Sequence, residues 1–240
     1  NPVAGEQSCE KITGEVKLHG AWLSPFSCRV KWALNFKGIP FEYTEENLSN
    51  KSLQVLQYNP IHKKVPIFLH GGNPICESMI IVEYIDEIWG QNPLLPTNPY
   101  EKAMARFWVK FADDKGLSVI WTFFLTTEKE RKNVIEDSLE ILKIVEDQCL
   151  GDKKFFGGDN INIVDIAFGP IAFWLGIIEE AVGFKLLEAK RFPHLHAWTN
   201  NFEEVPAIKE NLPDRDKLLF LFKSHRKAML RIVTRLNSRL

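Results

Sequence analysis

Two spacings of hydrophobic residues follow one another in the first third of the chain. Apolar runs suited to strands are interrupted by stretches in which hydrophobic residues return every three or four positions, as on one face of a helix. Gly38 is placed to stop the first of these helices, and Gly71 and Gly72 predict a tight turn. Strands are expected at 16–22, around Phe41 and Tyr43, at 65–70 and after the turn, and helices at 26–37, 52–58 and 77–89.

The order of these elements, β-α-β-α-β-β-α, is that of a thioredoxin-like domain. Pro93, Pro96 and Pro99 then interrupt the pattern, and because proline suits neither a helix interior nor a central strand, we expect a linker over 92–99. Beyond it only helical spacing is found. The predicted fold class is an α/β N-terminal thioredoxin-like domain plus an all-α C-terminal helical domain. The expected boundaries are a disordered leader at 1–15, the thioredoxin-like domain at 16–91 and the helical domain at 100–240.

One helix start in the second half of the chain is well specified. Asn162 and Asp165 match a variant of the capping box, in which each side chain accepts a hydrogen bond from the other residue's backbone. Ile161 and Ile166 stand at the positions that pack together as a hydrophobic staple. The sequence therefore predicts a helix that ends near Glu180, and the cap is expected to be structural.

Residues Ser24-Pro25-Phe26-Ser27 lie between the first expected strand and the first expected helix. A thioredoxin-like fold carries Cys-x-x-Cys at this place, and here a hydroxyl stands at both sulfur positions. Because serine forms no disulfide, electron transfer through a dithiol is excluded at this loop. The free N–H groups of a helix N-terminus stabilise an anion, and a thiolate is the anion to expect. The loop is therefore expected to activate the sulfur of another molecule.

Composition narrows the classes of partner. A formal net charge of −1 and 45% hydrophobic residues are typical of a soluble globular protein without a basic field for nucleic acid. The four cysteines lack the spacing that zinc needs, so we expect no metal, and reduced thiols fit a reducing compartment. No apolar run reaches the length of a membrane span, and the first residues lack signal-peptide features. We expect a cytoplasmic protein without nucleic-acid or membrane partners.

Seven short motifs, taken in order, resemble those of the soluble glutathione transferases. Their amino-acid sequences are similar to those of the plant tau class. The resemblance covers residues 16 to about 225. The motifs are Ser24-Pro25-Phe26, Asn50-Lys51-Ser52, Asn59-Pro60 with His62-Lys63-Lys64-Val65-Pro66, Ile75-Cys76-Glu77-Ser78, Asn92-Pro93-Leu94-Leu95-Pro96, Arg106-Phe107-Trp108 and Phe156-Gly157-Gly158-Asp159-Asn160.

The resemblance implies that glutathione is the co-substrate and that Ser24 is the catalytic residue. Its hydroxyl would donate a hydrogen bond to the glutathione sulfur, which favours the thiolate and lowers the pKa of the thiol from about 8.5. The alternative role for Ser24 is that of a plain helix N-cap. Ser27, one helical turn later, could supply the same hydroxyl, but the family match favours Ser24.

The remaining glutathione contacts are also implied by the resemblance. A cis Val65-Pro66 bond would let the backbone of Val65 pair with the glutathione peptide like an added strand. Glu77 would meet the γ-glutamyl ammonium, and Ser78 the γ-glutamyl carboxylate at a helix N-terminus. Lys51 and Lys64 would face the glycyl carboxylate, and the complete implied set is Ser24, Phe26, Lys51, Lys64, Val65, Pro66, Glu77 and Ser78.

The pocket for the second substrate is harder to read, because a stripe of aromatic residues at helical spacing is usually core. Leu117 and Trp121 stand where some tau relatives carry Tyr and Arg, which indicates a more apolar pocket. The expected pocket residues are Trp22, Phe26, Leu117, Trp121, Phe124 and Trp174.

The resemblance implies an enzyme that works as a homodimer and conjugates the glutathione thiolate to apolar electrophiles in detoxification and stress response. Two alternatives remain open at this point: reduction of organic hydroperoxides by the same thiolate, and carriage of apolar ligands without turnover. The chain ends Ser238-Arg239-Leu240, close to the Ser-Lys-Leu peroxisomal signal, so import into peroxisomes is the alternative to a cytoplasmic location.

Overall fold

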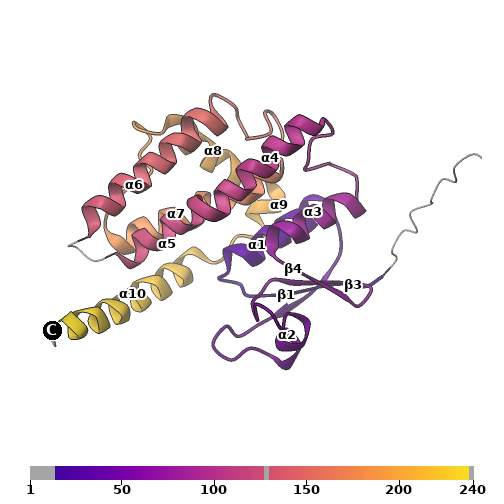
Figure 1. The fold of residues 1–240 in the computed structure, drawn as a ribbon, viewed down its shortest axis with the longest axis horizontal. Helices are drawn as coiled ribbons and strands as arrows, with labels where there is room; N and C mark the ends of the chain where they lie inside the picture. Colours follow the sequence, from indigo (N-terminus) through magenta and orange to yellow (C-terminus); the bar gives the residue numbers. More distant parts are fainter. Residues whose placement is uncertain (1–13, 127–129, 238–240) are drawn as a thin grey trace, which may run out of the picture.

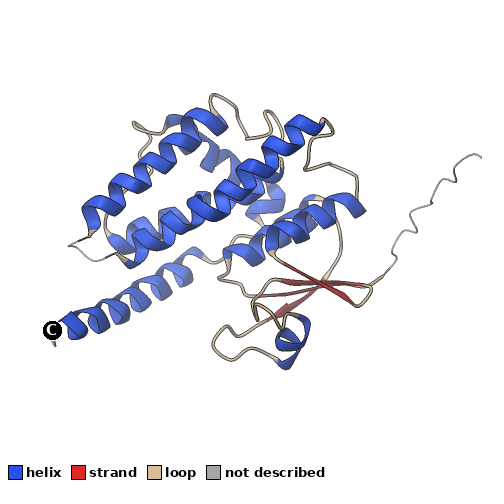
Figure 2. Cartoon of the chain, in the orientation of Figure 1, coloured by secondary structure: helices blue, strands red, loops and turns tan. Residues whose placement is uncertain are grey.

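The computed structural model describes residues 14–126 and 130–237. The predicted leader, apart from its last two residues, and the Ser238-Arg239-Leu240 ending lie outside the described residues. An α/β domain and a helical domain lie side by side, as the sequence predicts (Figures 1 and 2). None of the described helices is long and apolar enough to cross a membrane.

The α/β domain contains a four-stranded sheet in the order β2-β1-β3-β4, in which β1 and β2 are parallel and the other neighbours antiparallel. Helices α1 and α3 cover the face of the sheet that is turned toward the helical domain, and α2 lies on the other side (Figure 1). The predicted element order is confirmed. The elements are β1 (Val16–Gly20), α1 (Pro25–Phe36), β2 (Glu42–Glu45), α2 (Leu53–Tyr58), β3 (Ile67–His70), β4 (Asn73–Cys76) and α3 (Ser78–Ile88).

The helical domain is built around α7, whose residues from Ile163 to Leu175 are all buried. Two segments of this domain are π-helical: η1 continues α4 into α5, and η2 continues α6. The helix that begins at Arg131 therefore changes to the wider π-helical turn after Ile144. The elements are α4 (Pro99–Phe111), η1 (Ala112–Gly116), α5 (Leu117–Leu125), α6 (Arg131–Ile144), η2 (Val145–Leu150), α7 (Ile163–Val182), α8 (Pro193–Glu203), α9 (Pro206–Lys209) and α10 (Arg215–Asn237).

The predicted capping box at the start of α7 is confirmed. Asn162 Oδ1 accepts hydrogen bonds from the backbone of the first turn, and Asp165 Oδ2 accepts one from the N–H of Asn162 at 2.8 Å. Asp165 Oδ1 also accepts from Trp198 Nε1 (2.8 Å) and from the N–H of Phe156 (3.0 Å). Burial nevertheless raises the pKa of the Asp165 carboxyl to about 6. The cap thus also ties α7 to α8 and to the preceding loop.

The segment predicted as a linker contains no helix or strand before α4 begins at Pro99. A buried ion pair holds it to the α/β domain: Lys37 Nζ lies 2.7 Å from Asp86 Oδ1. The Asp86 carboxylate also accepts from the N–H groups of Leu94 (2.7 Å) and Leu95 (3.0 Å). Lys37 Nζ additionally donates to the carbonyl oxygens of Trp89, Gln91 and Asn92. The connection between the domains is therefore tethered to α1 and α3.

Candidate functional site

A pocket of about 120 Å³ lies where α1, the segment before β3 and the start of α3 meet. We call it the α1–α3 pocket. It brings together the predicted glutathione-binding residues except Ser24 and Lys51, and it adds Asn59, which was not predicted as a site residue. Its lining residues are Phe26, Asn59, Lys64, Val65, Pro66, Glu77 and Ser78.

The wall before β3 is shaped by a cis peptide bond and a buried asparagine. The Val65-Pro66 bond is cis, as the resemblance implies. Asn59 is 3% exposed and spans the preceding loop: its Oδ1 accepts from the N–H of His62, and its Nδ2 donates to the carbonyl of Lys64, both at 3.0 Å. The Asn59-Pro60 motif was visible in the sequence, but only the folded loop shows that the amide fixes this wall.

The start of α3 forms the opposite wall. Glu77 precedes the helix with φ 72° and ψ 114°, a conformation that non-glycine residues seldom adopt, and its side chain makes no capping hydrogen bond. That side chain is 58% exposed and lies 3.9 Å from His62 Nε2. Ser78 is the first helical residue and is 6% exposed. Backbone N–H groups at an uncapped helix start favour an anion, so a carboxylate fits here.

Ser24 is the N-cap of α1, and its Oγ accepts from the N–H of Ser27 at 3.2 Å. Capping uses the oxygen as an acceptor and leaves the O–H free to donate. Within the described part of the chain, that O–H has no acceptor. Ser27 is 0% exposed against 7% for Ser24, and its Oγ accepts from the N–H of Ala21 at 3.2 Å. The sequence offers Ser24 and Ser27 as sources of the hydroxyl that bonds the sulfur, and Ser24 is the more accessible of the two.

Arg29 is a buried residue of the site region that sequence reasoning missed. Its side chain is fully buried, its Nη1 donates to Ser78 Oγ (3.3 Å) and Asp113 Oδ1 (2.7 Å), and its Nη2 donates to the carbonyl of Ala167. Burial lowers the pKa of the guanidinium, and Asp113 opposes that change. Arg29 therefore joins α1 and the start of α3 to η1 and α7. Its position next to Val30, on the apolar part of α1, was the feature of the sequence that could have indicated its burial.

The protein's own thiols in this domain are unsuited to act as nucleophiles at neutral pH. Burial raises the pKa of the Cys28 thiol to about 12 and also raises that of Cys76. Because the thiolate is the reactive form, neither side chain is activated.

The two predicted lysines occupy different places. Lys64 lines the α1–α3 pocket, whereas Lys51 lies in the loop before α2 and is outside its lining. Lys63, the residue before Lys64, is exposed and is also outside the pocket lining.

The residues predicted for the electrophile divide into two groups. Leu117, Phe124 and Trp174 are 4%, 2% and 1% exposed and pack in the core. Trp174 Nε1 also donates to the carbonyl of Leu23 at 3.3 Å, next to Ser24. The other three, Trp22, Phe26 and Trp121, are partly exposed and so remain accessible to a ligand.

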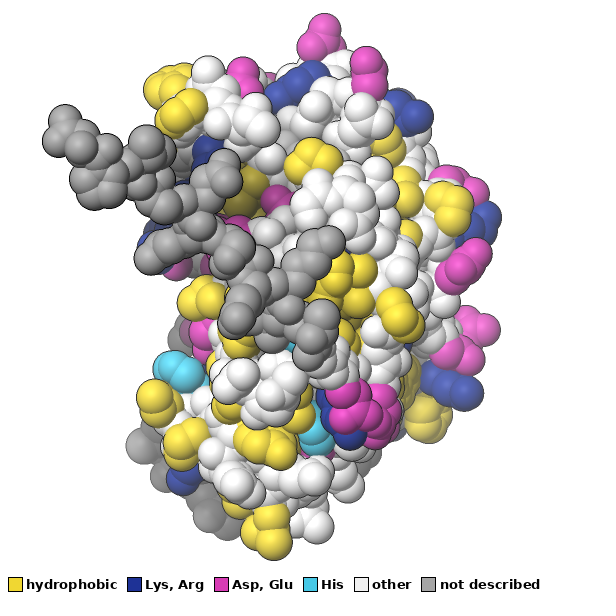
Figure 3. Space-filling view, turned by 90° about the vertical axis from the view of Figure 1, so that its right-hand side faces the viewer, with side chains coloured by type: hydrophobic (Ala, Val, Ile, Leu, Met, Phe, Trp, Pro, Cys, Tyr) yellow, Lys and Arg dark blue, Asp and Glu magenta, His cyan; other side chains and the backbone are white. Residues whose placement is uncertain are grey.

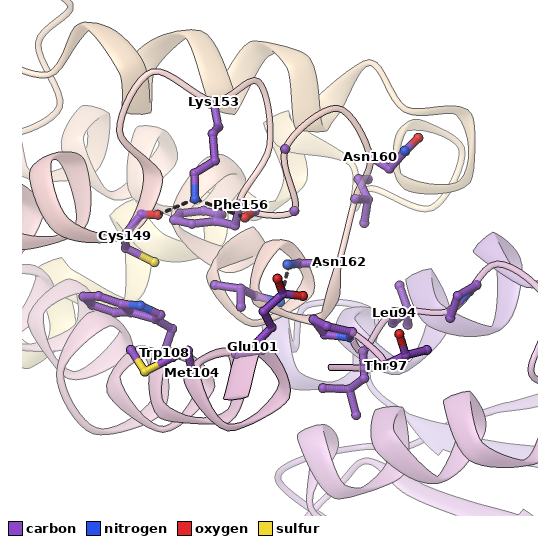
Figure 4. A pocket seen from close by; sticks show the side chains of 18 of the residues that line it. Leu94, Thr97, Glu101, Met104, Trp108, Cys149, Lys153, Phe156, Asn160 and Asn162 are labelled. Carbon is purple, nitrogen blue, oxygen red and sulfur yellow. Dashed lines mark hydrogen bonds between the residues drawn. The ribbon is translucent and has the colours of Figure 1, made fainter. Parts of the chain in front are cut away.

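A larger cavity, about 710 Å³, lies elsewhere, between the linker, α4 and the loop before α7. Figure 4 shows Trp108 and Met104 on one side and Lys153 on the other, where Lys153 Nζ donates to the carbonyls of Cys149 and Phe156. None of the predicted site residues lines it. We place the candidate site in the smaller α1–α3 pocket because groups suited to a peptide and its carboxylates converge there.

The described residues contain no group of three or more His, Cys, Asp or Glu side chains that could hold a metal ion. Acidic and basic side chains are interspersed over the face drawn in Figure 3, in keeping with the small net charge.

Comparison with known proteins identifies the family. Residues 14–87 match the model of the glutathione S-transferase N-terminal domain, and residues 107–206 match that of the C-terminal domain. A Glycine max protein described as "Probable glutathione S-transferase" is 48% identical over 216 residues, which are 90% of this chain and 96% of the soybean protein.

Two solved structures from plants are also similar. The tau class glutathione S-transferase of mango, Mangifera indica, has a TM-score of 0.82 and 40% identity, covering 87% of this chain and 97% of the mango chain. Rice GST1, solved in complex with glutathione, has a TM-score of 0.83 and 32% identity, covering 90% of this chain and 97% of the rice chain. This chain therefore belongs to the glutathione S-transferase family of enzymes and is of the plant tau type.

Proposed function

We propose that the enzyme binds glutathione in the α1–α3 pocket and conjugates its sulfur to apolar electrophiles, with Ser24 as the thiolate-stabilising residue. The observation that carries the proposal is the convergence of Val65, Glu77 and Ser78 on one pocket whose walls suit a peptide backbone, an ammonium and a carboxylate. Glutathione has these three groups.

Ser24 would act on the sulfur through its O–H. The hydroxyl oxygen is held in place by the N–H of Ser27, while the proton is available to the sulfur. A hydrogen bond donated to the thiolate favours the charged form and lowers the pKa of the thiol. The thiolate then forms a bond to an electrophilic carbon, and the leaving group departs with the electron pair of the broken bond.

The electrophile would be held by the partly exposed aromatic residues Trp22, Phe26 and Trp121. Phe26 is 36% exposed and also lines the α1–α3 pocket, so an apolar ligand on it would lie beside glutathione. Holding both reactants close together supplies part of the rate enhancement. The buried Leu117, Phe124 and Trp174 would support this surface from behind.

The direct test is a conjugation assay with an aryl halide and glutathione, run beside binding titrations with apolar ligands. Glutathione-dependent release of halide supports conjugation. Tight binding of apolar ligands without turnover would support the carrier role, and turnover only with organic hydroperoxides would support the peroxidase role.

A homodimer is proposed through the exposed face shared by α3 and α4. Ile80 on α3 is 59% exposed, and Phe107 on α4 is 54% exposed. An ion pair joins the two helices, with Arg106 Nη2 2.6 Å from Glu83 Oε2. Exposed large apolar side chains on one face favour association. We expect analytical ultracentrifugation to show a dimer for the wild type and a monomer for Phe107→Asp. A monomeric wild type would contradict this assembly.

The cellular location is proposed to be the cytoplasm, with peroxisomal import as the alternative. A fluorescent protein carrying residues 229–240 at its C-terminus decides between them. Diffuse fluorescence supports the cytoplasm, and punctate fluorescence that is lost when Leu240 is removed supports import.

A further inference from the structure

A buried histidine and a buried glutamate are paired beneath the loop that joins β2 to α2. His19 on β1 is 3% exposed, Glu46 at the start of the loop is 5% exposed, and His19 Nδ1 lies 2.8 Å from Glu46 Oε1. The ring of Tyr58, at the end of α2, lies 6.0 Å from the His19 ring. Polar groups this deeply buried are kept only when they are hydrogen-bonded, so the pair holds a defined geometry.

The Glu46 carboxylate closes the loop on itself. The N–H of Glu46 donates to the carbonyl of Gly20 at 2.7 Å, which fixes the first end of the loop to β1. At the other end, Ser52 donates its O–H to Glu46 Oε1 (2.9 Å) and its N–H to Oε2 (3.3 Å). Residues 47–51 are therefore held at both ends by one residue, and Lys51 is the last of them.

The same contacts also set the start of α2. Ser52 Oγ accepts from the N–H of Val55 at 3.2 Å and is the N-cap of this helix. Inside the loop, Asn47 Oδ1 accepts from the N–H groups of Ser49 (2.9 Å) and Asn50 (3.2 Å). One continuous set of hydrogen bonds thus runs from His19 through Glu46 and Ser52 into α2.

The neighbouring glutamate has a different role. Glu45 accepts from the N–H of Trp22 (3.0 Å) and from the hydroxyl of Tyr43 (3.0 Å), on the other side of the strand end. Among the described residues, His19 is the titratable side chain that bonds Glu46. The loop end at Ser52 therefore depends on Glu46 and, through it, on His19.

We infer that Glu46, oriented by His19, is a positioning residue that sets the Ser52 end of the loop and thereby places Lys51 for the glycyl carboxylate of glutathione. This inference rests on the proposed function and on the role that the family resemblance implies for Lys51, which is to face that carboxylate. Neither His19 nor Glu46 lines the α1–α3 pocket. Their removal should therefore weaken recognition of the glycyl end and leave the thiol chemistry at Ser24 intact.

The experiment compares glutathione with γ-glutamylcysteine, which carries the same thiol and γ-glutamyl group but lacks glycine. Glu46→Gln is expected to raise the KM for glutathione about tenfold, as for the loss of a hydrogen bond to a charged group, with kcat within about twofold. The KM for γ-glutamylcysteine should stay within about twofold. The preference for glutathione over the shorter thiol therefore falls.

Three further variants test the route of the effect. His19→Leu should reproduce the loss, and His19→Gln, which keeps a side-chain N–H donor, should restore most of the preference. Lys51→Ala should also lower the preference for glutathione. The double variant of Lys51→Ala and Glu46→Gln should lower it by less than the product of the factors by which the two single variants lower it. Glu42→Gln is the matched control, because Glu42 is an exposed carboxylate on β2 paired with Lys17 at 3.1 Å.

The outcomes separate this inference from the function on which it rests. An unchanged preference in Glu46→Gln, or an equal rise in KM for both thiols, would overturn the positioning role. A wild type without any preference for glutathione would overturn both the glycyl contact of Lys51 and the inference. If Glu46→Gln fails to fold, Ser52→Ala, which removes only the O–H donor and the cap, must show the same selective loss, and equal KM changes for both thiols would again overturn the role.

Discussion

The α/β domain and the helical domain differ in where the structure places the residues predicted for each site. In the α/β domain, Val65, Glu77 and Ser78 converge on a pocket formed by backbone features: a cis proline and a helix start. In the helical domain, Phe124 and Trp174 turn out to be core residues. Polar groups tied to backbone geometry can be located from sequence, whereas an aromatic side chain serves a core and a binding surface equally well.

The largest expected effect separates the core from the exposed surface of the helical domain. Trp174 is 1% exposed and bonds the Leu23 carbonyl, so Trp174→Ala should lower the free energy of unfolding by about 3–5 kcal/mol. Trp121→Ala, at a partly exposed site, should cost less than about 2 kcal/mol. Urea unfolding measures both, and equal losses would show that the two tryptophans are buried alike.

Glutathione binding should depend on the α/β domain. Ser78→Ala or Glu77→Gln is expected to weaken binding by about 1–3 kcal/mol, because a charged group of the ligand loses its partner. Isothermal titration calorimetry gives the dissociation constants, with Lys63→Ala as an exposed control from the same region. Unchanged dissociation constants in both site variants would show that Glu77 and Ser78 do not bind the γ-glutamyl group of glutathione.

The two substrates should respond to different domains. Trp121→Ala should raise the KM for an aryl halide several-fold and leave the KM for glutathione within about twofold, because an aromatic contact contributes about 0.5–1.5 kcal/mol beyond its buried area. Steady-state kinetics with each substrate varied in turn measures this. Equal rises in both KM values would contradict the division between the domains.

The smallest expected effect concerns the pH dependence of stability. Burial alone would raise the pKa of Glu46, but hydrogen bonds from His19 and Ser52 outweigh it and hold the pKa below its usual range. A carboxyl with a lowered folded pKa stabilises the fold above its unfolded value of about 4.3, and this stabilisation is lost as the pH falls through the folded pKa. Wild type should therefore exceed Glu46→Gln in stability near neutral pH and lose that advantage in acid, as measured by urea unfolding across pH. A stability difference in favour of the wild type that grows as the pH falls would contradict this prediction.

Local signals in the sequence predicted much of the fold. Apolar spacing gave the element order, Gly38 with φ 66° ends α1, and Asn162 with Asp165 begins α7 as expected. These features depend on residues within a few positions of one another, and so they can be read from a short stretch of sequence.

The contacts that could not be predicted join distant parts of the chain. Arg29 on α1 meets Asp113 of the π-helical η1 in the other domain, and Lys37 holds the linker through Asp86. A charged residue in a sequence is by default taken to be a solvated surface group, even where, as at Arg29, it lies beside apolar residues of a helix. Their pairing depends on how the two domains pack, which local spacing does not specify.

Whether the hydroxyl of Ser24 stabilises the glutathione thiolate can be measured as the pKa of enzyme-bound glutathione, from its ultraviolet thiolate absorbance. Ser24→Ala should raise this pKa toward about 8.5 and lower kcat by about 10²-fold, the scale for losing one donor to an anion. Ser27→Ala, at a buried hydroxyl that accepts from Ala21, should leave the pKa unchanged and affect mainly stability. An unchanged pKa in Ser24→Ala together with a raised pKa in Ser27→Ala would exclude Ser24 as the thiolate-stabilising residue and assign the role to Ser27.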